Sequence, residues 1–524
     1  MAIKKFTANV DNTIVNTFET NMSTRATGSN SGQADIVEVY SIWARQQISS
    51  SATSGSQELS RVLMKFPISD ISSSRVSNII PASGRVNFYL RVFEAEHSRT
   101  IPKNFELVVQ AISRSWEEGD GMDLTTYKDL TKNEEGSNWM RASKAAAWSS
   151  VGGDYHANPT FVQYFTGGIG DVEINITELV EEWIHGNKSN YGLGIRLSSS
   201  YEAYYSGSTG ADVDGIVHNP DGAKKSYYTK RFFARGSQYY FKRPVLEARW
   251  DSVTRDDRAD FHYSSSLATD DDNFNTIFLY NYVRGRLRDI PAIGTSDIYV
   301  SIYTGSVTSS LPSSKSERVL LEGSADGGAV THTSATGSHV STGIYKCEIC
   351  LTNSYDDRHT YYDVWHSADN ASTYVEYFTG SIKPKVLDAS MGSRDPVYFI
   401  NITNLRNSYM NNQNARFNVY IREKNWSPTV YSKASQEVET LTIRSASYRV
   451  IRTRDGIEAV PHETSSVLST GLSYDASGNY FNFDMKLLQP GYEYGFKFAF
   501  YDDELGSWQE QDRLFKFRVN KNEH

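Results

Sequence analysis

Short segments in which apolar and polar residues alternate run through the whole chain. Clear examples are residues 85–93 (RVNFYLRVF), 418–421 (NVYI) and 494–500 (YGFKFAF), and Ser, Gly, Asn and Asp separate such segments. A period of two, with many aromatic and β-branched residues, is the pattern of a strand with one buried face. The sequence therefore predicts an all-β protein.

One segment has the helical period instead. Residues 177–186 (TELVEEWIHG) place Leu, Val, Trp and Ile at relative positions i, i+1, i+4 and i+5, which puts them on one face of a helix. Thr177 is a candidate N-cap, and Gly186 is a candidate helix end. We expect this to be the one short helix within a run of strands.

The length of 524 residues fits about three or four domains. Polar, charged sequence follows Trp250, and a new set of strands follows Lys385. These changes predict domains at 1–252, 253–385 and 386–524. The expected architecture is an N-terminal jelly-roll β-sandwich followed by two smaller immunoglobulin-like β-sandwiches, a fold whose usual size suits the last two.

The charge pattern limits the classes of partner. The chain has 53 Lys and Arg against 62 Asp and Glu, a net charge of −9, and its basic residues form no run. Nucleic-acid binding needs a clustered positive face, so we expect none. No apolar stretch is long enough to span a membrane, and residues 1–12 lack the apolar core of a secretory signal.

The common catalytic signatures are absent. The sequence has no G-x-S-x-G, no G-K-[ST] and no H-E-x-x-H. Cys347 and Cys350 are expected to be unpaired, partly buried thiols, and a redox or metal-binding C-x-x-C pair is the alternative. The acidic residues of segment 117–123 fit solvated loop acids, and a glycosidase pair of carboxylates is the alternative. We therefore expect a protein that is not an enzyme.

No cofactor is expected, although a structural Ca²⁺ ion is an open alternative, since Ca²⁺ takes oxygen ligands from carboxylates and carbonyls. The acidic turns closest to that chemistry contain Asp212, Asp214, Asp270 and Asp272. A plain turn is the other interpretation of each.

Tyrosines crowd the late part of the first domain. They are Tyr201, Tyr204, Tyr205, Tyr227, Tyr228, Tyr239 and Tyr240. Tyrosine rings stack on sugars and are also enriched at protein interfaces. These seven residues are the candidate interface or glycan contacts.

A series of motifs between residues 60 and 250 occurs in a characteristic order. It comprises 61–68 (RVLMKFPI), 86–90 (VNFYL), 114–119 (RSWEEG), 174–183 (INITELVEEW), 190–197 (NYGLGIRL), 230–237 (KRFFARGS) and 243–246 (RPVL). In this order the motifs resemble the DNRLRE-type β-sandwich domain, which is related to carbohydrate-binding modules. The resemblance implies a jelly-roll sandwich, and surface display or glycan contact. Two departures are FARGS at 233–237, where the family has Ser-Arg-Glu, and a long insertion between Ser198 and Tyr227.

The remainder of the chain carries other aromatic-rich motifs. Segments 279–287 (LYNYVRGRL), 430–434 (VYSKA), 478–484 (GNYFNFD) and 491–500 (GYEYGFKFAF) are similar to segments in structural proteins of tailed bacteriophages, particularly marine ones. This resemblance covers roughly residues 270–519 and implies a virion component.

Two functions follow as expectations. The first is a non-enzymatic virion structural protein of the neck, tail or capsid surface, which docks to other virion proteins and to copies of itself and contacts a host surface glycan. Virion proteins are made in the host cytoplasm and released by lysis, so a signal peptide is not needed. The alternative is a carbohydrate-binding or carbohydrate-active cell-surface protein.

Overall fold

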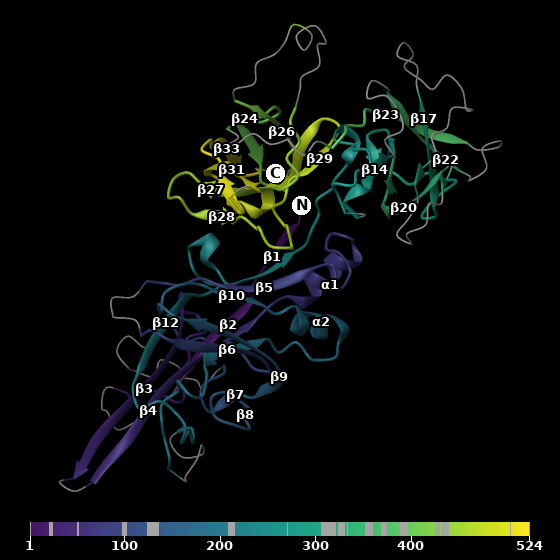
Figure 1. The fold of residues 1–524 in the computed structure, drawn as a ribbon. Coiled ribbons are helices and arrows are strands. Elements are labelled where there is room, and N and C mark those ends of the chain that lie inside the picture. Colours follow the sequence, from purple (N-terminus) through teal and green to yellow (C-terminus); the bar gives the residue numbers. More distant parts are fainter. Residues whose placement is uncertain are drawn as a thin grey trace. The chain divides into compact units, whose positions relative to one another are not determined.

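A computed structural model shows a chain whose regular secondary structure is nearly all β, which confirms the predicted fold class (Figure 1). The structure describes residues 2–19, 25–49, 52–96, 102–122, 136–207, 215–269, 271–304, 321–322, 331–332, 334–351, 360–367, 375–387, 397–424, 430, 440–503 and 505–522. Contacts divide the chain into two compact units, residues 2–251 and 252–524. The boundary expected near Lys385 lies inside the second unit and stays a prediction.

The first unit is a sandwich of two antiparallel sheets. The four-stranded sheet has the order β1 (Ile3–Thr7), β13 (Val245–Arg249), β5 (Asn87–Val92), β10 (Val172–Asn175). The seven-stranded sheet has the order β12 (Tyr227–Phe233), β3 (Ile36–Ser49), β4 (Ala52–Lys65), β11 (Leu193–Leu197), β6 (Phe105–Ile112), β9 (Tyr155–Phe165), with β2 (Val10–Val15) also paired to β4. A small hairpin joins β7 (Arg141–Ser143) to β8 (Ala146–Ala147).

Alternation along the strands produces two apolar layers. Val62 and Met64 of β4 point into the core between the sheets, together with Leu193 and Ile195 of β11. The intervening residues, such as Leu63, point to the opposite face of the sheet. There they pack into a second cluster, which the loops of the unit cover, and it also contains Leu59, Ile112, Trp139, Trp148 and Val151.

Among its described residues, the first unit has two α-helices. The expected one is α2 (Thr177–His185), and Gly186 ends it in the left-handed conformation at φ 76°. The expected N-cap role of Thr177 is wrong: no side chain caps the helix, the Thr177 hydroxyl accepts from the Phe88 N–H at 2.8 Å, and the Thr177 N–H donates to Asn175 Oδ1 at 3.0 Å. The other helix, α1 (Ile68–Val76), was not expected, because four serines in ISDISSSRV leave almost no apolar period.

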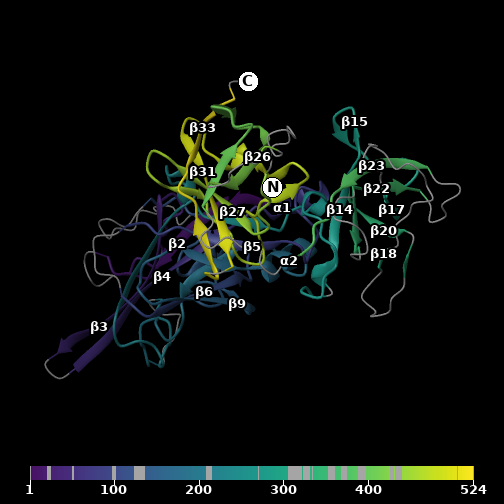
Figure 2. The same ribbon diagram turned by 45° about the horizontal axis from the view of Figure 1, so that its top comes forward.

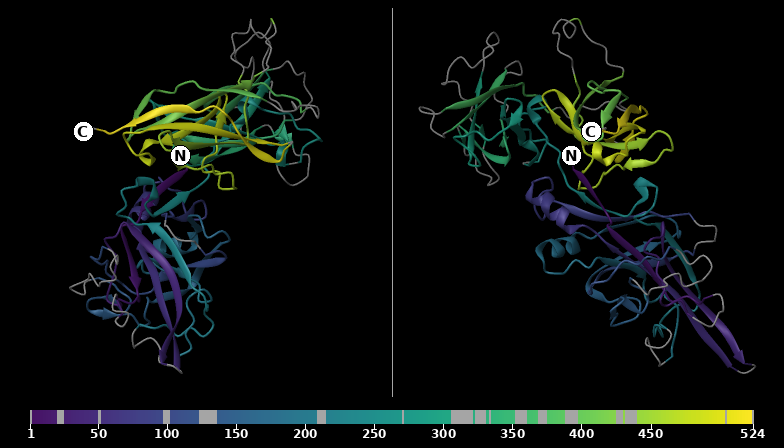
Figure 3. Two further views of the ribbon diagram at one scale, coloured as in Figure 1. Left: turned by 90° about the vertical axis from the view of Figure 1, so that its left-hand side faces the viewer. Right: turned by 180° about the vertical axis from the view of Figure 1, so that it is seen from behind.

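The hairpin of β3 and β4 extends past the other strands of its sheet (Figures 1 and 3). β12 pairs with β3 only over residues 36–41, while β2 and β11 pair with β4 only over residues 60–65. The two strands continue to pair with each other as far as Ser49 and Ala52.

The second unit begins with a six-stranded antiparallel sheet curled around its own core (Figure 2). Its order is β14 (Asn275–Tyr280), β21 (Ile344–Ile349), β20 (Ala335–Ser341), β17 (Ile298–Thr304), β22 (Tyr361–His366), β23 (Glu376–Ile382). Short pairs join β15 (Tyr282–Val283) to β16 (Arg286–Leu287) and β18 (Leu321–Glu322) to β19 (Thr331–His332). As expected, no disulfide joins Cys347 and Cys350; both are buried, and burial raises the pKa of Cys347 to about 12.

The last part of the second unit is a two-sheet sandwich. One sheet has the order β24 (Tyr398–Ile402), β26 (Asn414–Glu423), β30 (Gly478–Asp484), β29 (Ser473–Asp475). The other has the order β25 (Ser408–Met410), β33 (Phe515–Asn520), β31 (Glu493–Asp502), β27 (Ala446–Arg452), β28 (Glu458–Val460), with β32 (Ser507–Glu510) on β31. Stacked rings fill its core, with Phe496 and Phe517 centred 4.6 Å apart.

The described part of the chain also contains single turns of 3-10 helix, which are η1 (Tyr240–Lys242), η2 (Asp257–Ala259), η3 (Asp271–Asn273) and η4 (Met485–Leu487). Over the residues that the structure describes, no helix has the length and apolar character needed to cross a membrane.

Candidate functional site

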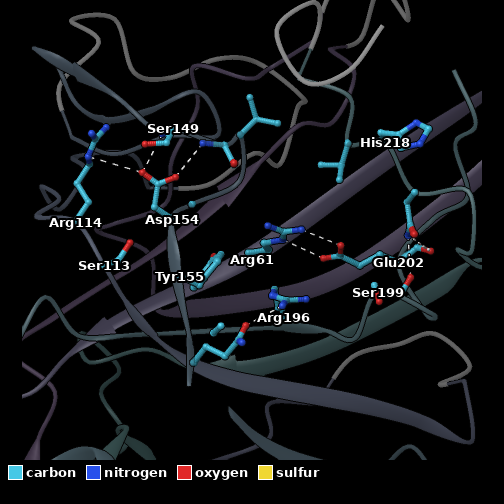
Figure 4. A pocket seen from close by; sticks show the side chains of 17 residues that line it. Arg61, Ser113, Arg114, Ser149, Asp154, Tyr155, Arg196, Ser199, Glu202 and His218 are labelled. Atoms are coloured by element: carbon cyan, nitrogen blue, oxygen red, sulfur yellow. Dashed lines mark hydrogen bonds and ion pairs between the residues drawn. The ribbon is translucent and has the colours of Figure 1, made fainter. Parts of the chain in front are cut away.

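A polar pocket lies on the first unit, on the face of the seven-stranded sheet that points away from the sandwich core (Figure 4). Its volume is about 740 Å³, within the usual range for small-molecule sites. Strands β4, β6, β9 and β11 supply its floor, and segments 149–154, 199–202 and 217–219 supply its walls.

Strand alternation places two arginines on this floor. Val62 of β4 pairs with Ile195 of β11, and both side chains enter the sandwich core. Arg61 and Arg196 are the next residues along the two antiparallel strands, so both point to the outer face. Two like charges opposite one another across a strand pair are unfavourable unless other groups compensate them.

The positive charge of Arg61 is compensated by an ion pair with Glu202. Its Nε and Nη2 donate to the two carboxylate oxygens of Glu202 at 2.9 and 2.8 Å, and its Nη1 donates to the Gly152 carbonyl at 3.0 Å. Both side chains are almost fully buried, with Arg61 7% exposed and Glu202 4% exposed. Burial opposes the charge on Arg61, but Glu202 outweighs it and holds the pKa of Arg61 above its usual value.

Arg196 has no such counter-charge. Its Nη2 donates to Gln110 Oε1 at 2.8 Å, and its Nη1 donates to the Leu197 carbonyl at 3.3 Å. No carboxylate lies within ion-pair distance of it among the residues that the structure describes. Burial and the nearby Arg61 charge lower the pKa of Arg196, and the more distant charge of Glu202 offsets this only in part.

The ring of Tyr155 lies between the two arginines. Its centroid is 5.9 Å from the Arg61 guanidinium carbon and 5.6 Å from that of Arg196, both within cation-π range. The ring lies over Gly194, where a Cβ atom would be 2.3 Å from Tyr155 Cε1. Glycine at position 194 therefore makes room for the ring on the pocket floor.

A second ion pair lies at the pocket wall. Asp154 accepts from the backbone N–H groups of Ser149 and Ser150, both at 2.9 Å, and lies 3.7 Å from Arg114 Nε (Figure 4). Its carboxylate is thus held by the loop and by one cation. The pocket has three guanidinium groups and two carboxylates, and each carboxylate is committed to a guanidinium other than Arg196.

The insertion after Ser198 forms the opposite wall. Asn219 donates from its side chain to the Ser199 carbonyl at 2.8 Å, and its backbone exchanges hydrogen bonds with Tyr205 at 2.8 and 2.9 Å. The Trp139 indole donates to the Gly215 carbonyl at 2.8 Å. These bonds fix the described parts of the insertion against the second apolar cluster. This wall of the pocket is therefore held in place by hydrogen bonds.

The seven predicted tyrosines do not form one platform. Tyr201 and Tyr227 pack edge to face with ring centroids 5.1 Å apart, and Lys224 Nζ lies 4.6 Å from the Tyr204 ring centroid. These residues, with Tyr205, lie near the start of β12. The backbone of Tyr228 pairs with Tyr40 in β3, and its side chain lies outside the described part.

The other two tyrosines follow the far end of the same strand. Tyr239 and Tyr240 are exposed, and Tyr239 packs on Phe233 at 5.3 Å between centroids. The seven residues of β12 separate this pair from Tyr227 by roughly 20 Å. The roles of these tyrosines as interface or glycan contacts stay a prediction.

The calcium candidates are only partly described. Asp212, Asp214 and Asp270 lie outside the described residues. Asp272 lies in η3, where its Oδ2 accepts from the Thr269 hydroxyl at 2.8 Å, as in an ordinary turn. Among the described residues, no group of three His, Cys, Asp or Glu side chains is placed to hold a metal ion.

Sequence reasoning did not identify the pocket residues Arg61, Tyr155, Arg196 and Glu202. A signal existed, because Arg61 and Arg196 each sit inside a strand motif, where a charge needs a partner or a site. The alignment of the two strands brings the arginines together, and the pairing register cannot be read from the motifs.

Comparisons with known proteins add little to this geometry. No family model matches the chain, and no curated protein matches it. Among solved structures, the chain is similar to one described as tandem Ig repeats of Dlar, at 9% identity and a TM-score of 0.12, over 43% of this chain and 90% of that one.

Proposed function

We propose that this protein is a non-enzymatic structural subunit of a tailed-bacteriophage particle, which attaches to neighbouring subunits by β-strand pairing. The resemblance of residues 270–519 to phage structural proteins supplies the context. The observation that carries the docking role is the free end of the β3–β4 hairpin, residues 44–49 and 52–56, here called the β-arm.

The β-arm has unused pairing capacity on both sides. Its two strands pair with each other from Ala44 and Ser56 to Ser49 and Ala52. No third strand pairs with them in the part of the chain that the structure describes. Apart from Gly55, each outer edge therefore presents backbone N–H and C=O groups in the order that an added strand requires.

The sequence of the β-arm indicates that pairing with a further strand would stabilise it. Residues 44–56 read ARQQISSSATSGS, in which Ile48 is the single large apolar residue. A two-stranded hairpin alone in water is marginally stable, and this one can bury little apolar surface. A neighbouring strand would add a ladder of hydrogen bonds, as in β-augmentation.

The test compares the full chain with an arm-deleted variant. Trp43 and Gln57 are a directly opposed pair in the hairpin, so replacing residues 44–56 by Asn-Gly closes it with a tight two-residue turn. We expect the wild-type chain to form oligomers by light scattering and to co-sediment with particles from an infected-cell lysate. The deleted variant should lose both while its circular dichroism stays that of a folded β-protein.

A matched control keeps the arm and changes side chains only, as Q46T/Q47T. Strand pairing uses backbone groups, so this variant should associate as the wild type does. A wild-type chain that stays monomeric and absent from particles would overturn the proposal, as would full association of the deleted variant.

The second candidate function, carbohydrate binding at a cell surface, is favoured by a different observation, the polar pocket of the first unit. A polysaccharide array probed with the purified full chain tests it. Binding by a monomer that never joins a particle would favour this alternative.

A further inference from the structure

A short hairpin of the second unit, residues 281–288 (NYVRGRLR) and here called the basic hairpin, extends from the end of β14 (Figure 2). Its strands β15 and β16 pair with each other and with no other strand in the described part of the chain. The Arg288 N–H donates to the Asn281 carbonyl at 3.1 Å, and the Asn281 side chain donates to the Arg288 carbonyl at 2.7 Å. These bonds hold the hairpin at its base.

The tip of the basic hairpin is a tight turn with an unusual residue. Arg284 and Gly285 both have positive φ, 52° and 76°, as the two central residues of a type I′ turn require. Asn, Asp or Gly is favoured at the first of these positions, and an arginine there costs free energy. Backbone strain of this kind is concentrated at functional sites. Arg284 is therefore a candidate for a contact outside the chain.

Three arginines of the basic hairpin have no counter-charge. Arg284, Arg286 and Arg288 are exposed, and none of them lies within ion-pair distance of a carboxylate in the part of the chain that the structure describes. Apolar side chains lie beside them, since Tyr282 is 59% exposed and Val283 is 44% exposed. Arginine and tyrosine are enriched among the residues that contribute most to protein interfaces. This composition suits docking to an acidic, partly apolar surface.

The same unit has a hairpin of complementary character. Strands β31 and β32 turn at residues 502–507 (DDELGS), here called the acidic hairpin. Asp503 is exposed and pairs with no cation among the described residues, and Asp502 Oδ1 accepts from the Leu505 N–H at 3.1 Å. Leu505 is 61% exposed. The acidic hairpin therefore offers the carboxylates and the apolar surface that the basic hairpin requires.

We propose that the basic hairpin of one copy docks on the acidic hairpin of a second copy. Both hairpins are exposed in the single chain, so neither is covered by the other. Duplex DNA would also attract the arginines, but its phosphate backbone offers no apolar surface to Tyr282 and Val283.

The contact joins two different surfaces, so it runs head to tail and extends to further copies. It rests on the proposed function, because a contact between two turns is too small to hold copies together without the pairing of the β-arm.

Sedimentation velocity of the purified full chain over a concentration series tests the proposal. R284N/R286Q/R288Q removes the three charges, and asparagine suits the backbone at position 284. Its self-association should be about tenfold weaker than that of the wild type, or more. The matched control R85Q/R406Q/R454Q also changes the net charge from −9 to −12, at exposed arginines elsewhere, and should associate as the wild type does.

Charge reversal tests the pairing of the two hairpins directly. R286E and D503R should each weaken self-association, because each sets like charges against one another in the contact. The chain that carries both changes should regain self-association, since the two reversed charges attract again. A merely structural effect of either change would not be rescued in this way, and thermal melts establish that each variant is folded.

Self-association of R284N/R286Q/R288Q equal to that of the wild type would overturn the proposal, as would an R286E/D503R chain that associates no better than the single variants. Binding of duplex DNA that the triple variant loses, with self-association unchanged, would assign the basic hairpin to nucleic acid instead.

The two proposals fail in different ways. A wild-type chain that is monomeric in solution but co-sediments with particles would overturn the contact between hairpins alone. Full association of the arm-deleted variant, with weakened association of R284N/R286Q/R288Q, would overturn the role of the β-arm and leave the hairpin contact standing.

Discussion

Arg61 and Glu202 form a doubly hydrogen-bonded ion pair across 141 residues of sequence, at 2.9 and 2.8 Å. The pair joins strand β4 to the insertion that follows Ser198. An insertion of this kind needs an anchor, because loop residues gain little from burial of their own. The pair supplies that anchor and at the same time fixes the charge on one side of the pocket.

Removing the negative member of this pair should destabilise the first unit. E202Q leaves the Arg61 guanidinium buried without its counter-charge, and breaking a buried pair costs about 3–5 kcal/mol. Scanning calorimetry of the full chain should show a transition at lower temperature in E202Q than in the wild type. The exposed Glu96 gives the control E96Q, which should leave the melting temperature unchanged.

Gly194 provides a second test of the pocket floor. In G194A the new Cβ would lie 2.3 Å from Tyr155 Cε1 and 3.1 Å from Cζ, so the ring must shift. Overpacking of this kind costs about 1–3 kcal/mol, which urea unfolding of the full chain measures. Gly167 has open space around its Cβ position, so G167A serves as the control. Equal stability of both variants would contradict the described packing of Tyr155.

Sequence reasoning reached the fold class because alternation is a local property of the backbone. Segment 494–500, for example, predicted a strand and lies inside β31. Helix α1 was missed because its serines hide the period, and only Ile68, Ile71 and Ser74 are buried. Local pattern therefore predicts an element only where its buried face is apolar.

The pocket could not be predicted from local sequence patterns, and the cause is a different one. Arg61 and Arg196 are neighbours only through the pairing of β4 with β11, a contact between residues 135 positions apart in sequence. Glu202 belongs to the insertion that interrupts the motif order, where no periodic pattern exists. Tertiary register, which alternation cannot specify, creates the site.

In the second unit, Tyr474 connects β29 to the segment that follows residue 251. Its hydroxyl donates to Asp257 Oδ1 at 2.8 Å, while Asp257 Oδ2 accepts from the Thr276 N–H at 2.7 Å. Y474F should cost about 1–3 kcal/mol, because it leaves a buried carboxylate oxygen without this donor. Calorimetry of the full chain checks this, and Y501F, at a residue 38% exposed, is the control. A Y474F transition at the wild-type temperature would contradict the role of this bond.

His462 makes the second unit sensitive to acid. Its Nδ1 lies 3.2 Å from the Ser447 hydroxyl and its Nε2 lies 3.8 Å from Glu510. Burial and the Arg449 charge lower its pKa from 6.5 to about 4, although Glu510 opposes them. Since the unfolded chain binds the proton more tightly, the stability from a neutral His462 is present above pH 6.5 and is lost as the pH falls towards 4.

The loss expected from His462 is about 2–3 kcal/mol over that window. H462Q cannot take up the proton, so its stability should fall less than that of the wild type between pH 6.5 and pH 4, measured by urea unfolding of the full chain. Asp256, whose pKa burial raises to about 6, acts with the opposite sign, since its ionisation costs stability as the pH rises. It is present in both proteins, so the difference between them isolates His462. Parallel pH profiles for H462Q and the wild type would show that His462 titrates normally in the folded chain.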